Sequence, residues 1–110
     1  MKTQNYFFGN EIKSVDLGNG ITRKVTAYNE NLMSVENHFE EGAISPIHSH
    51  ANEQITYVVS GEFEFNIDGE IQIMKAGDSH YKQPDLKHGC KCLKAGILFD
   101  TFTPFRKDFL

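Results

Sequence analysis

Closely spaced turn signals constrain the fold of this 110-residue chain more than any other feature of its sequence. A glycine next to a small or polar residue recurs at positions 18–20, 41–42, 60–61, 68–69, 76–77 and 95–96. Glycine favours tight turns because it adopts positive φ angles without a steric penalty. Segments with the 3.6-residue repeat of a helix are absent, apart from single turns near the two termini. The spacing therefore predicts an all-β chain.

Segments rich in β-branched and aromatic residues lie between these turns. They span residues 21–28, 32–39, 54–60, 62–67, 70–75 and 96–102. Asp68-Gly69 separates two of them and predicts a two-residue hairpin. Many short antiparallel strands in so small a chain favour a sandwich or barrel. A chain of this length has room for one core, so we expect a single domain over residues 1–110.

Charge and cysteine usage narrow the classes of partner and the compartment. A net charge of −4 without a basic cluster argues against nucleic acid and anionic membranes. The first residues lack the apolar core of a signal peptide, and no apolar segment is long enough to span a bilayer. Cys90 and Cys92 form a C-x-C pair, which is near the distance limit for a disulfide. We therefore expect reduced thiols in the cytoplasm, beside a pocket and sensitive to oxidation.

The pair His48 and His50 is the strongest chemical signal in the sequence. Residues two apart on a strand point to the same side, so both imidazoles can bind one cation as neutral nitrogen ligands. An isolated H-x-H pair is a weak motif, but here further glycine, proline and polar residues accompany the pair at defined spacings. The accompanying residues are Gly42, Pro46, Gln54 and Gly61, followed by Gly77, Asp78, Pro84 and His88.

The last predicted strand carries an unexpected carboxylate. Leu98, Asp100 and Phe102 share one face of this strand. Burying an unpaired carboxylate among apolar side chains is costly, so Asp100 requires either hydrogen-bonding partners or a functional role. The opposite face is also apolar, and we expect it to pack on another sheet or on a second subunit in a homodimer.

The two groups of residues around the histidines resemble the two motifs of the cupin superfamily. The resemblance implies a single cupin domain, a double-stranded β-helix or jelly-roll-like barrel of two antiparallel sheets. It also implies one divalent metal in the barrel mouth, with the ligands His48, His50, Gln54 and His88. Imidazole and oxygen donors suit Ni, Zn, Fe, Co and Mn alike, so the metal stays open. Cupins often have Glu as the fourth ligand, and Glu53 is the alternative to Gln54, although strand alternation turns it outward.

The C-terminal stretch FDTFTPFRKDFL resembles the small cupins of the pectin-degradation family. That family converts 4,5-unsaturated monouronates, released by lyases from pectin or alginate, into linear 4-deoxy-5-keto uronates. The resemblance implies an enzyme acting on a small sugar acid, with Asp100, Phe102 and Arg106 in its active site. Asp100 would act as the general acid or base, Phe102 would pack on the sugar ring, and Arg106 would bind a carboxylate or hydroxyl through its forked N–H groups.

Other readings of the same residues stay open. Asp100 and Arg106 could form an ion pair that holds the C-terminal tail, with Phe102 as an ordinary core residue. The chain could also be another metal-dependent cupin enzyme, such as a dioxygenase or a sugar isomerase, or a non-catalytic cupin that binds sugar acids.

Overall fold

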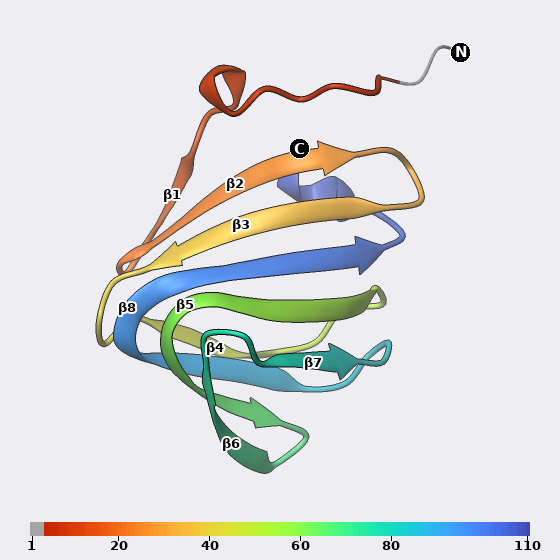
Figure 1. The fold of residues 1–110 in the computed structure, drawn as a ribbon. Coiled ribbons are helices and arrows are strands. Elements are labelled where there is room, and N and C mark those ends of the chain that lie inside the picture. Colours follow the sequence, from red (N-terminus) through yellow and green to blue (C-terminus); the bar gives the residue numbers. More distant parts are fainter. Residues whose placement is uncertain (1–3) are drawn as a thin grey trace.

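The computed structural model describes residues 4–110, which form a barrel of antiparallel strands (Figure 1). The strands are β1 (Val15–Gly18), β2 (Ile21–Tyr28), β3 (Met33–Phe39), β4 (Ile44–His48), β5 (Glu53–Ile67), β6 (Glu70–Lys75), β7 (Ser79–Lys82) and β8 (His88–Thr103). Single 3₁₀ turns, η1 (Gly9–Glu11) and η2 (Lys107–Phe109), lie near the termini, as predicted. Neither short helix is long or apolar enough to cross a membrane. The single domain over 1–110 stays a prediction, because positions 1–3 lie outside the described residues.

Two long strands organise the barrel. The sheet order is β1-β2-β3-β8-β5-β6, with β4 added to β8 and β7 added to β5. β5 and β8 are antiparallel partners from Glu53 opposite Thr103 to Ile67 opposite His88. Both strands curve, so each contributes to both layers of the barrel (Figure 1). This arrangement is the double-stranded β-helix that the resemblance to cupins implied.

Two of the predicted turns are wrong, because β5 and β8 bend at these positions and continue as strands. Ser60-Gly61 and Ala95-Gly96 lie inside continuous strands and do not end them. A Cβ atom on Gly96 would lie 2.1 Å from the carbonyl oxygen of Ser60, so only glycine lets the two backbones approach this closely. By contrast, Asp68-Gly69 is the predicted hairpin, with both residues at positive φ and Ile67 paired with Glu70.

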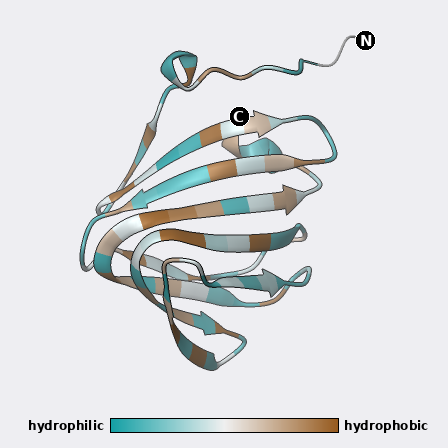
Figure 2. Ribbon diagram, viewed as in Figure 1, coloured by the Kyte–Doolittle hydropathy of each residue, from teal (hydrophilic) through white to brown (hydrophobic). Residues whose placement is uncertain are grey.

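Strand alternation places a polar band between two apolar clusters inside the barrel. Residues opposite one another across the ladders point to the same face. The inner rows are Met33-Phe102-Gln54-Lys82, Val35-Asp100-Thr56-His80 and Arg23-Asn37-Leu98-Val58. Hydrophobic and hydrophilic bands accordingly alternate along the strands (Figure 2). Apolar burial in the two clusters holds the polar band in place.

The outer face of β5 carries exposed apolar side chains. Ile55, Tyr57 and Val59 are 51%, 46% and 46% exposed. The sequence anticipated an apolar outer face on the last strand, where Ile97 and Phe99 of β8 are half-buried, whereas the exposed apolar surface on β5 was not predicted. The homodimer stays a prediction.

Candidate metal centre and catalytic cavity

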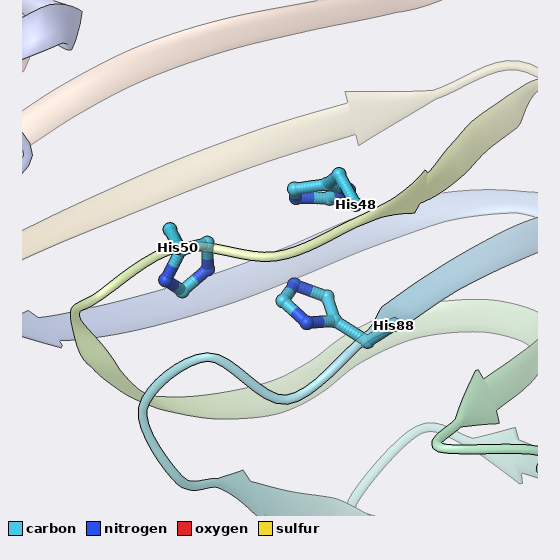
Figure 3. Close-up of side chains that lie close together, drawn as sticks. All are labelled: His48, His50 and His88. Carbon is cyan, nitrogen blue, oxygen red and sulfur yellow. The ribbon is translucent and has the colours of Figure 1, made fainter.

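Three histidines converge at one end of the barrel. His48 ends β4, His50 lies in the following loop, and His88 begins β8 directly opposite His48 in the ladder. One ring nitrogen from each residue lies within 4.8 Å of the other two. The three rings point toward a common centre (Figure 3). The structure therefore brings together the three histidines that the sequence singled out.

Backbone carbonyls set the protonation of these rings. The Nδ1 atoms of His48, His50 and His88 lie 2.8, 3.0 and 2.8 Å from the carbonyl oxygens of Pro46, Asn52 and Leu86. Because a carbonyl only accepts, each Nδ1 carries a proton, and a neutral ring then keeps a free lone pair on Nε2. Burial lowers the pKa of His50 and lowers that of His88 to about 4, which keeps both rings neutral at pH 7. Neutral imidazoles oriented in this way suit a metal ion.

The contact between Gln54 and His50 indicates that a cation fits this site. Oε1 of Gln54 lies 2.9 Å from Nε2 of His50, so two lone pairs face each other. The amide cannot turn over freely, because its Nε2 donates to Thr56 and Asp100. A divalent cation bound by both atoms would satisfy them, so the donor set of three imidazoles and one amide oxygen fits a metal.

Asp100 accepts hydrogen bonds from three neutral side chains. Oδ1 accepts from the hydroxyl of Thr56 and, at 2.9 Å, from the amide of Gln54. Oδ2 accepts from Nδ2 of Asn37 at 2.7 Å. The side chain is almost completely buried yet lines a polar cavity. The carboxylate therefore has its partners and also faces the space where a ligand would bind.

A cavity of about 370 Å³ lies beside the histidines. Its polar lining includes His48, Gln54, His88, Asp100, Lys82, Arg23, Arg106 and Asp108. Three of these side chains are cations and two are anions, so the lining carries excess positive charge before any metal binds. Such a cavity suits a small anionic ligand.

Lys82 is a buried cation that no sequence motif indicated. Its Nζ donates to Oγ1 of Thr56 at 3.1 Å and lies 2.9 Å from Nε2 of His80. Burial lowers the pKa of Lys82, and it lowers the pKa of His80 to about 3, so His80 is a neutral acceptor. Lys82 lies opposite Gln54 in the ladder, and this shared inward direction becomes visible only with the register.

The two cysteines are free, as expected, but they lie in different surroundings. Cys90 lines the cavity, whereas Cys92 is fully buried in the apolar core. Burial raises the pKa of Cys90 to about 12. Because the thiolate is the reactive form, this thiol is poorly reactive, which argues against the expected sensitivity to oxidation.

Phe102 and Arg106 lie beside the metal-binding set. The Phe102 ring is 5.6 Å from the ring of His50, centroid to centroid. Arg106 directs Nε and Nη2 to the carboxylate of Asp108 at 3.1 and 3.0 Å. Within residues 4–110, no ion pair joins Arg106 to Asp100. The alternative in which these two residues pin the tail is therefore wrong, and the fork expected to bind the substrate already holds Asp108.

Two residues considered in the sequence, Glu53 and His38, face away from the cavity, whereas Arg23 lines it. Glu53 points outward and accepts a hydrogen bond from the hydroxyl of Tyr81. His38 lies on the outer face beside Glu36, as expected for a surface residue. Arg23, from β2, lines the cavity and was not predicted. The alternation of Ile21, Arg23 and Val25 in the sequence was the signal that could have found it.

The barrel and the three-histidine cluster in its opening together define a cupin. The family model for the cupin domain matches residues 35–98. A curated relative, the pectin degradation protein KdgF of Dickeya dadantii (strain 3937), is 42% identical over 109 residues, covering 97% of this chain and 99% of the relative.

Two solved structures resemble the whole chain. KdgF from a Halomonas species superposes with a TM-score of 0.92 at 34% identity, covering 98% of this chain and all of that one. An RmlC-like cupin from Shewanella frigidimarina superposes with a TM-score of 0.93 at 41% identity over the full length of both chains. This chain belongs to the KdgF family of cupins.

Proposed function

We propose that this protein is a metal-dependent enzyme that opens the ring of 4,5-unsaturated monouronates to give linear 4-deoxy-5-keto uronates. The observation that carries the proposal is the hydrogen bond between Asp100 and Gln54, which joins a buried carboxylate to a neutral metal-binding set. Support also comes from the end-to-end similarity to a pectin degradation protein. The upstream polymer would be pectin or alginate.

The reaction is an isomerisation that needs no co-substrate. The hydroxyl on C1 loses its proton, a carbonyl forms at C1, and the bond from C1 to the ring oxygen breaks. The ring oxygen keeps the electron pair as an enolate on C5, and protonation of C4 then yields the ketone. The site must therefore move one proton and stabilise negative charge on one oxygen.

The ligand set proposed for the metal is His48, His50, Gln54 and His88. Because all four donors are neutral, a divalent cation held there would keep its full charge and supply Lewis-acid stabilisation for the developing enolate. Ni, Zn, Fe, Co and Mn are all compatible with these donors.

Asp100 is proposed to accept and return the proton. Oδ2 accepts one hydrogen bond, from Asn37, and a carboxylate oxygen has two lone pairs, so one acceptor position remains for a substrate hydroxyl. Phe102 would offer its ring to the sugar, and Arg106 would contribute positive charge close to His50.

The test follows the far-ultraviolet absorbance of the conjugated alkene in 4,5-unsaturated galacturonate. Purified protein should remove this absorbance well above the spontaneous rate, a chelator should abolish the effect, and a divalent metal should restore it. No acceleration by protein shown to carry metal would reject this substrate class. Oxygen consumption with substrate, or uronate binding without turnover, would then favour an oxygenase or a binding protein.

A further inference from the structure

The cavity wall formed by β2 and the C-terminal tail carries two guanidinium groups around one aromatic ring. The Cζ atoms of Arg23 and Arg106 lie 3.7 and 4.3 Å from the centroid of Phe109. All three side chains line the cavity. This cluster is separate from the proposed metal ligands and has no role in the chemistry described above, apart from the charge of Arg106.

The two arginines differ in what they bind. Arg106 is engaged by Asp108 through two hydrogen bonds. Among residues 4–110, the Nε of Arg23 is buried without a hydrogen-bond partner, and no ion pair involves this side chain. A guanidinium stays protonated, so a buried charged donor is left unsatisfied. Leaving such a group unpaired costs free energy, and the charge of Arg23 is not already neutralised by a partner among residues 4–110.

Register explains how Arg23 reaches the cavity. It lies opposite Asn37, whose amide donates to Oδ2 of Asp100. Arg23 therefore lies on the same inner face as the network that orients the proposed acid–base group. The neighbouring Lys24 has the opposite direction on β2 and pairs with Glu36 in the ladder.

The side chain of Asp108 shows which chemical group this wall accepts. Its carboxylate accepts hydrogen bonds from the guanidinium of Arg106. Burial lowers the pKa of Arg23, and the negative charge of Asp108 partly offsets this by raising it. A carboxylate thus already binds one of the two arginines of this wall. Planar guanidinium groups match carboxylates through paired hydrogen bonds.

We propose that Arg23 binds the carboxylate of the uronate substrate and thereby selects acidic over neutral sugars. The inference rests on the proposed function for the identity of the ligand. It assigns the anchoring role to an arginine on β2, outside the part of the chain that the cupin family model covers. Beside it, Arg106 binds Asp108 and packs on the ring of Phe109 in the C-terminal tail.

The experiment compares Arg23→Gln and Arg23→Lys with wild type and with Lys24→Gln, which removes a charge from the outer face of the same strand. Calorimetry on metal-loaded protein measures the binding of D-galacturonate and of its neutral methyl ester. Arg23→Gln should weaken galacturonate binding about 10- to 100-fold and leave ester binding nearly unchanged, as expected for losing a hydrogen-bonded charge. Arg23→Lys should fall between, and Lys24→Gln should match wild type. With 4,5-unsaturated galacturonate, KM should rise much more than kcat falls.

Equal loss of acid and ester binding in Arg23→Gln would overturn the proposal, because Arg23 would then only pack against Phe109. The same conclusion follows if wild type does not prefer the acid over the ester. Thermal melting and metal content check folding, and Arg23→Lys decides the question if Arg23→Gln does not fold. Binding of galacturonate through Arg23 without turnover of the unsaturated uronate would reject the proposed function and leave this inference standing.

Discussion

The side-chain amide of Gln54 donates a hydrogen bond of 2.9 Å from Nε2 to Oδ1 of Asp100. This contact turns Oε1 of Gln54 toward Nε2 of His50, where a metal would bind. One hydrogen bond therefore couples the orientation of a proposed ligand to the proposed acid–base group. Outer-shell contacts of this kind tune both metal affinity and ligand orientation.

Asp100→Asn should impair turnover and also weaken metal binding. The remaining oxygen of the variant can still accept from Thr56 and Gln54, but its NH2 group faces the donor of Asn37, so the network that holds the Gln54 amide is weakened. We expect kcat to fall about 10²- to 10⁴-fold and metal affinity to fall about 10- to 100-fold. Kinetics at saturating metal and metal titration measure the two effects separately. Full activity would remove Asp100 from the mechanism.

His88→Ala should abolish metal binding, whereas His38→Ala should not. His88 is buried beside His48 and His50, while His38 lies on the outer face against Glu36. Loss of a direct ligand should reduce metal affinity by at least about 100-fold, more than outer-shell changes typically do. Elemental analysis after dialysis gives the result, and His38→Ala serves as the matched control. Equal metal content in both variants would contradict the proposed ligand set.

Asn52→Ala should loosen the C-terminal tail. The Asn52 amide donates to the carbonyl oxygens of Pro104 and Phe105 at 2.8 and 3.2 Å. Losing both bonds should lower the free energy of unfolding by about 1–2 kcal/mol. Urea unfolding and limited proteolysis after Arg106 measure the change, and Asn31→Ala, in an exposed loop, is the control. Resistance of the tail to protease, unchanged from wild type, would show that other contacts hold it.

Metal-free protein should lose stability as the pH falls below 6.5. The pKa of His80 is lowered from 6.5 to about 3 and that of His88 to about 4, in both cases chiefly by burial. Below pH 6.5 the unfolded chain therefore binds protons that the folded protein does not bind. The free energy of unfolding consequently decreases as the pH falls. Each such proton contributes a slope of up to about 1.4 kcal/mol per pH unit.

The variant His80→Gln measures how much His80 contributes to this pH dependence of the free energy of unfolding. Its amide can accept from Lys82 as His80 does, but it does not titrate. Denaturant unfolding of chelator-treated protein between pH 6.5 and pH 4 should give a shallower slope for the variant than for wild type. Parallel slopes would mean that His80 is protonated in the folded protein.

Local geometry explains what the sequence alone determined. A strand alternates its side chains with a period of two, so the inward direction of Gln54, Thr56 and Val58 follows from their spacing, and all three are buried. The same rule placed Asp100 on the inner face with Leu98 and Phe102. The hairpin at Asp68-Gly69 depends only on two residues that tolerate positive φ.

Tertiary structure decided the features that depend on register and on the path of the tail. Strand alternation gives the inward direction of Arg23, but only the register of β2 on β3 places it opposite Asn37 and beside the cavity. Ser60-Gly61 and Ala95-Gly96 became bends because two distant glycines meet across β5 and β8. The tail lies beside the loop that carries His50 because the Asn52 amide donates to the carbonyl oxygens of Pro104 and Phe105. Contacts between residues far apart in the sequence arise only when the whole barrel closes.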